Sequence, residues 1–95
     1  MLIEKPYKSN DVISLRTETT EIVGRLKEEG ESTITLTKPM SVMVTPEGVG
    51  LGPLFFTVAE DKDVVIHKSS IIAGPLATRD DFAKSYIQNT TGLTI

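Results

Sequence analysis

The chain has 95 residues, a length typical of one domain. It contains no cysteine, which excludes disulfides, thiolate metal sites and a cysteine nucleophile. Ten Lys and Arg residues against 13 Asp and Glu residues give a net charge of −3, which argues against a surface that is basic all over. A local basic site remains compatible with this balance, because identical subunits could bring their few basic residues together.

No segment of the sequence predicts a secretion signal or a membrane span. The N-terminal residues 1–11 lack an apolar core of signal-peptide length. The longest uncharged stretch, residues 48–59, is broken by glycine and proline and falls short of the roughly 20 apolar residues that cross a bilayer. We therefore expect a soluble, intracellular (cytoplasmic) protein without a membrane partner.

The first half of the chain predicts short strands. Residues 11–18 mix β-branched and polar side chains, and residues 21–27 alternate around Gly24, which leaves room for a sharp bend or close packing. Residues 32–37 alternate cleanly between apolar and polar side chains, as a half-buried strand does. The alternation resumes after Pro39, a residue that marks a sheet edge or a bulge.

The second half predicts a loop, further strands and one helix. Residues 45–53 have the composition of a loop, and residues 54–59 that of a strand with Phe55 and Phe56 on opposite faces. One of these rings is expected in the core and the other at a subunit contact. Two shorter apolar runs follow, and a Gly-Pro pair is expected to end the sheet; these are residues 64–66, 71–73 and 74–75.

The last segment reads as an amphipathic helix over residues 78–89. Thr78 and Asp81 have the spacing of a capping box, and four apolar residues then fall on one helical face: Phe82, Ala83, Tyr86 and Ile87. The fold predicted for residues 1–95 is therefore all-β dominated (β-rich with one helix). It is a small, strongly bent five-stranded antiparallel barrel with strands over about 11–73, because closure reduces the number of exposed edges.

Several motifs are interpreted as structural. The GVGLG run at residues 48–52 lacks the Gly-Lys-Ser/Thr end of a phosphate loop and is followed by Pro53. The acidic clusters at residues 28–31 and 60–63 read as solvated turns. Ser69 and Ser70 beside a histidine do not make a triad without geometry. We expect no enzyme activity, no cofactor and no metal site.

The run VVIHKSSII, residues 64–72, holds the only histidine, His67, next to Lys68. Two interpretations stay open on these residues alone. The pair lies in a polar hairpin turn, or in a turn that contacts a ligand.

The order of these features resembles the Sm-like (LSm) family of RNA-binding ring proteins. The first Sm motif runs apolar-x-Gly-x-Leu, then an acid and apolar-x-Leu; the corresponding segments here are residues 22–26 and 29–36. The second motif, an apolar strand ending in Ile-Arg-Gly, corresponds to residues 64–72. Thr33 and Ser32 stand where the family has Asn and Met, and His67-Lys68 stand for Arg-Gly. The similarity extends to small Sm-like proteins of marine phage (cyanophage) type and covers residues 11–37 and 63–73.

The resemblance implies a homo-oligomeric ring in which the last two strands pair with the next subunit. It also implies that the turns with Thr33 and His67-Lys68 face a central pore and bind RNA or single-stranded nucleic acid, with a possible role in RNA or DNA processing. Lys68 and protonated His67 would contact phosphate or base edges, Thr33 would offer a hydroxyl, and Ser32 and Ser69 are secondary candidates.

A second hypothesis keeps the same small barrel as a structural or adaptor module of a phage assembly, without nucleic-acid binding. The acidic net charge favours it. Its distinguishing feature would be an exposed apolar patch away from the ring contacts, for instance around Met40, Val42 and Val44.

Overall fold

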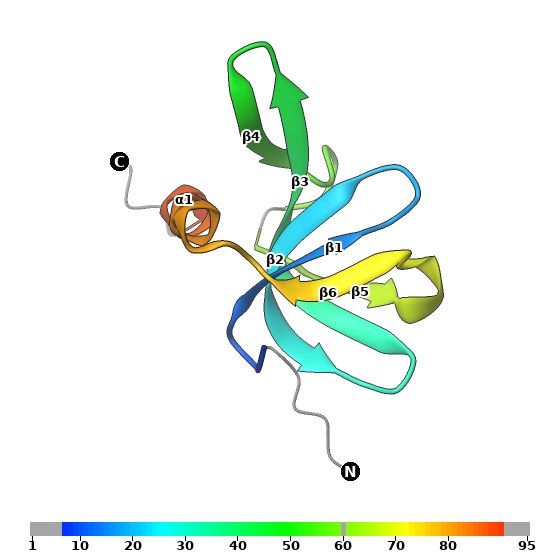
Figure 1. The fold of residues 1–95 in the computed structure, drawn as a ribbon. Coiled ribbons are helices and arrows are strands. Elements are labelled where there is room, and N and C mark those ends of the chain that lie inside the picture. The colour runs from blue at the N-terminus through cyan, green and yellow to red at the C-terminus, as the bar shows by residue number, and fades with distance from the viewer. Residues whose placement is uncertain (1–6, 60, 91–95) are drawn as a thin grey trace.

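The computed structural model describes residues 7–59 and 61–90. This part of the chain forms six strands, one 3-10 turn and one C-terminal helix (Figure 1): β1 (Val12–Arg16), β2 (Glu21–Glu29), β3 (Thr33–Thr45), β4 (Gly48–Pro53), β5 (Asp63–His67), η1 (Lys68–Ser70), β6 (Ala73–Ala77) and α1 (Asp80–Thr90). The predicted β-rich class with one helix is confirmed. The predicted number of strands, five, is wrong by one.

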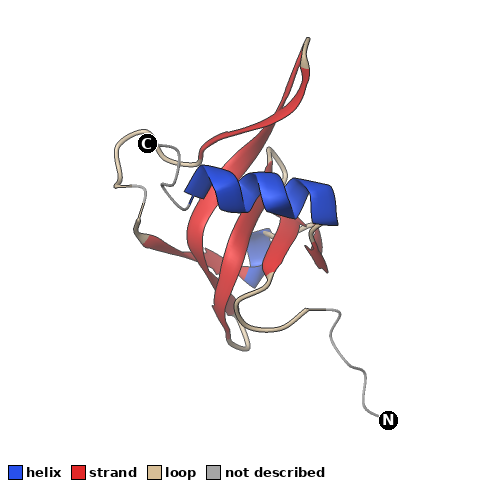
Figure 2. Ribbon diagram, turned by 90° about the vertical axis from the view of Figure 1, so that its left-hand side faces the viewer, coloured by secondary structure: helices blue, strands red, loops and turns tan. Residues whose placement is uncertain are grey.

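All six strands belong to one antiparallel sheet in the order β4-β3-β2-β1-β6, and β5 also pairs with β3. Both pairings fit because β3 is 13 residues long: Thr33 to Thr37 pair with β5, and Met40 to Thr45 pair with β4. The sheet is strongly bent, and the hairpin of β3 and β4 projects from its body (Figures 1 and 2). We call this hairpin, residues 40–53, the arm.

The core lies inside the bent sheet. Apolar side chains that alternate along β1, β2, β3 and β5 point inward and are almost fully buried: Ile13, Leu15, Ile22, Leu26, Ile34, Leu36 and Ile66. Gly24 lies where β2 crosses β3, and a Cβ atom there would come within 3.1 Å of the Leu36 Cβ. The close packing expected at Gly24 is therefore present, and a larger residue would push the two strands apart.

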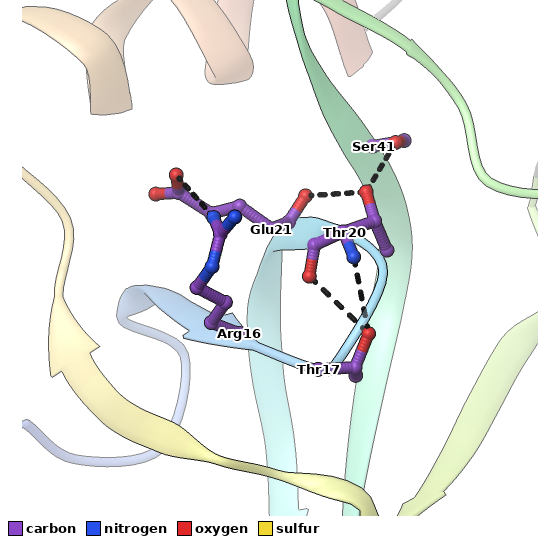
Figure 3. Close-up of polar contacts among 5 residues, drawn as sticks. All are labelled: Arg16, Thr17, Thr20, Glu21 and Ser41. Atoms are coloured by element: carbon purple, nitrogen blue, oxygen red, sulfur yellow. Dashed lines mark hydrogen bonds and ion pairs between the residues drawn. The ribbon is translucent and has the colours of Figure 1, made fainter.

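The turn around Thr19 and Thr20 joins β1 to β2 and is also hydrogen-bonded to β3 (Figure 3). The Thr17 amide donates to the Thr20 carbonyl over 2.9 Å, and the Thr20 amide donates to the Thr17 hydroxyl. The Thr20 and Ser41 hydroxyls are 2.9 Å apart, and Arg16 faces Glu21 across the turn. These polar contacts fix the turn next to the base of the arm.

Helix α1 lies across the outside of the strands (Figure 2). Its predicted apolar face is confirmed, because Tyr86 is buried and Phe82, Ala83 and Ile87 are half-buried. The predicted cap is wrong: the helix begins at Asp80, and the Thr78 hydroxyl lies 2.7 Å from that of Ser14. None of the helices in the described residues is long and apolar enough to cross a membrane.

Three segments differ from the prediction. Residues 48–53, expected as a loop, form β4, because the uncharged run can pair with the second half of β3. Residues 54–59, expected as a strand, have no strand partner, and both Phe55 and Phe56 are exposed. Gly74 and Pro75, expected to end the sheet, lie within β6 at its edge, where a missing amide donor is tolerated.

Candidate functional site

The two turns singled out in the sequence lie side by side at one end of the sheet. Thr33 opens β3 and His67 ends β5, and these two residues are direct partners in the antiparallel register. The Lys68 amide donates to the Ser32 carbonyl over 2.8 Å, which joins the two turns through the backbone. Residues separated by more than 30 positions in the chain are thus brought together. We call residues 30–33 and 67–70 the paired turns.

Internal hydrogen bonds give each of the paired turns a defined shape. The Gly30 amide donates to the Thr33 carbonyl over 2.9 Å, which closes the first turn. In the second turn the Ser70 hydroxyl donates to the His67 carbonyl over 2.7 Å, and the Ile71 amide donates to that of Lys68 over 3.1 Å. The side chains of Ser32, His67 and Ser69 are left exposed, whereas Thr33 is half-buried.

Lys68 differs from the other candidates because its charge is already paired. Its Nζ atom lies 2.8 Å from Oε2 of Glu29, at the end of β2. The Lys68 side chain is 33% exposed and that of Glu29 only 11%. The Tyr7 hydroxyl donates to the other carboxylate oxygen, Oε1, over 3.0 Å. Burial, and then the hydrogen bond to Glu29, raise the pKa of the Tyr7 phenol.

Glu29 and Tyr7 are the residues that sequence reasoning missed at this site. Glu29 falls in an acidic run that reads as a solvated turn, but β2 continues through it and brings its carboxylate inward. The only signal in the sequence is the resemblance, which has an acid at this position. Tyr7 carries no signal, because it precedes the first strand and reaches Glu29 only through the fold.

The charge around the paired turns is mixed. Glu31 is exposed within the first of these turns, and Glu28 is exposed at the end of β2. Farther away, Lys27 is bound to Asp63, which begins β5 at the end opposite His67. This ion pair lowers the pKa of the Asp63 carboxyl. In residues 7–59 and 61–90 no cluster of His, Asp and Glu side chains could hold a metal ion.

A groove lies at the base of the arm, away from the paired turns. It has a volume of about 320 Å³ and lies between β3, the segment after β4 and the end of α1. Its walls are mainly apolar, with Pro39, Met40, Leu54, Phe55 and Val58 among the lining residues. Lys38, which also lines the groove, donates from Nζ to the Thr90 carbonyl over 2.8 Å.

No protein-family model matches the chain, and no curated protein matches it.

Proposed function

We propose that this protein binds RNA or another single-stranded nucleic acid through the paired turns, as a self-associated ring. The observation that carries the proposal is the meeting of Thr33 and His67 as register partners, with Lys68 bonded to the Ser32 backbone. These residues offer hydroxyl, imidazole and ammonium groups on one small surface. Such groups commonly bind phosphate oxygens and base edges.

Self-association is supported by the open edges of β5 and β6. Among the described residues β5 pairs only with β3, and β6 pairs only with β1, so each has one edge without a strand. Val65, Ile72 and Leu76, on or next to these strands, are more than half exposed. Pairing of β5 with β6 of the next subunit would satisfy both edges and repeat around a closed ring.

A ring would compensate for the weakness of a single site. Within the paired turns, the only basic side chains of one subunit are His67 and Lys68, and Lys68 is bound to Glu29. Repeating the paired turns once per subunit along one strand of nucleic acid raises the effective concentration of each later contact. On this proposal the protein has no catalytic residue and acts in RNA or DNA processing by binding.

The test is fluorescence anisotropy with labelled oligo-U and oligo-A RNA, and with DNA of the same length. The double variant His67→Ala/Lys68→Ala should lose binding, and wild-type affinity should fall steeply with salt. Lys84→Ala is the matched control, because it removes an exposed cation from α1. Equal binding by wild type and the double variant, or no binding at low salt, would reject the proposed site.

A second candidate function is that of a structural or adaptor module. The arm supports this candidate, and the paired turns do not. Met43, Val44 and Val49 are exposed on the arm, and Phe55, Phe56 and Val58 are exposed beside it. Strand β4 ends the sheet and has no charged residue, whereas natural edge strands are commonly protected by charge. This apolar surface favours contact with another protein. Substitutions on the edge strands β5 and β4, followed by measurement of the oligomeric state, distinguish the two candidates.

A further inference from the structure

We propose that Glu29 restrains ligand binding by holding the ammonium group of Lys68 in competition with phosphate. The inference rests on the proposed function, because it concerns the same paired turns. It identifies Glu29 as a residue that sets affinity for nucleic acid without contacting it.

The geometry of Glu29 makes it an effective competitor. Its carboxylate is held at both oxygens, by Lys68 Nζ at 2.8 Å and by the Tyr7 hydroxyl at 3.0 Å. Its side chain is only 11% exposed, so water screens this ion pair less than it screens a pair on the open surface. The bond from Tyr7 also keeps the carboxylate facing Lys68.

When a phosphate approaches Lys68, the ammonium group of this lysine is therefore already paired with Glu29. It must draw the ammonium away from Glu29, or share it and bring two negative groups close together. Both routes weaken binding, and both depend on contact between Glu29 and Lys68. Glu31 differs, because it is exposed in the neighbouring turn and has no ion pair among the described residues.

The experiment measures oligo-U affinity and its salt dependence for wild type, Glu29→Gln and Glu31→Gln. Glu29→Gln should bind about three- to tenfold more tightly, the range expected for an ion pair of this exposure. The freed lysine should steepen the slope of log affinity against log salt by about 0.7 for each added phosphate contact. Glu31→Gln, with the same change in net charge, should produce a smaller gain.

The same substitutions in a Lys68→Ala background separate the effect of the Glu29–Lys68 ion pair from long-range repulsion between the carboxylate and the nucleic acid. If Glu29 acts by holding Lys68, the gain from Glu29→Gln disappears when Lys68 is absent. A gain that survives in this background would overturn the inference, because it would reflect long-range repulsion alone.

Glu29→Asp provides a second variant that keeps the charge but shortens the reach to Lys68. It should also tighten binding, whereas general repulsion predicts no change. Circular dichroism and the urea midpoint show whether each variant is folded.

The outcomes distinguish this inference from the proposed function. Absence of binding by wild type and all variants at low salt would reject the function itself. Wild-type binding with equal effects of Glu29→Gln and Glu31→Gln, and none of Glu29→Asp, would reject only the role of Glu29. Wild-type binding that strengthens more in Glu29→Gln than in Glu31→Gln, and does so only when Lys68 is present, would support both.

Discussion

The hydroxyl of Tyr86 lies 2.8 Å from the carbonyl oxygen of Lys38, at the point where β3 changes from its pairing with β5 to its pairing with β4. Lys38 has a positive φ of 50°, which is uncommon for a residue with a side chain. The same hydroxyl lies 2.8 Å from the Thr37 carbonyl and accepts from the Arg25 amide over 3.2 Å. One buried phenol thus joins α1 to both β2 and β3 at this bend.

Replacing Tyr86 by Phe should therefore destabilise the fold. The ring would still fill its site, but the backbone groups around it would lose a buried hydrogen-bond partner. We expect a loss of about 1–3 kcal/mol in the free energy of unfolding, measured by urea denaturation. Gln88→Ala, at an exposed position of the same helix, should change stability little. Equal midpoints for wild type and Tyr86→Phe would contradict this role.

Stability should also fall at high pH because of the same phenol. Burial is the largest influence on the pKa of Tyr86 and raises it above the ordinary value of 10.0. Below that value the phenol is protonated in both folded and unfolded chains, so stability is unaffected. As pH rises above it, the unfolded chain loses the proton first, and the free energy of unfolding declines. Urea midpoints across this range should fall less steeply for Tyr86→Phe than for wild type.

Gly24→Ala should destabilise the protein through a steric clash. The new methyl group would lie 3.1 Å from two atoms of the Leu36 side chain and 3.3 Å from the Pro39 Cα. Overpacking of this kind costs about 1–3 kcal/mol. Gly50→Ala is the matched control in the arm, because a Cβ there has no atom within 4 Å. A thermal melt in which both variants shift equally would rule out the clash.

Nucleic-acid affinity should rise as pH falls, if His67 contacts the ligand. A protonated imidazole carries a positive charge, which favours contact with phosphate. Anisotropy measured at constant ionic strength should show tighter binding in mildly acidic buffer for wild type and a flatter profile for His67→Ala. A profile that is the same for both proteins would show that His67 does not contact the ligand.

Two lysine substitutions should separate ring formation from association through the arm. Val65 on β5 and Val49 on β4 are almost equally exposed, at 56% and 57%. A lysine at an edge strand opposes pairing, so Val65→Lys should dissociate the proposed ring, and Val49→Lys should leave it intact. Light scattering after size-exclusion chromatography gives the mass of each species. The opposite pattern would support the adaptor candidate.

Sequence patterns were sufficient for the elements whose side chains repeat with a clear period. The alternation through Ile34 and Leu36 indicated a half-buried strand, and the spacing of Phe82 and Tyr86 indicated the helix and its buried face. The candidate turns were also located by sequence, because polar residues interrupt an apolar run at His67 and Lys68. These features depend on the pattern of apolar and polar side chains within a short segment, and this pattern can be read from the sequence alone.

Tertiary structure decided the features that depend on pairing between distant segments. The run at residues 48–53 became a strand because the long β3 offered it an edge, while residues 54–59 found no partner despite their strand-like composition. The ion pair of Lys68 with Glu29 could not be predicted from the sequence either, because it requires β2 to continue through an acidic run whose composition predicts a turn. The sequence by itself determined which segments could be buried. The tertiary structure decided which segments pair, because a strand edge or a charged group needs a partner, and that partner lies far away in the sequence.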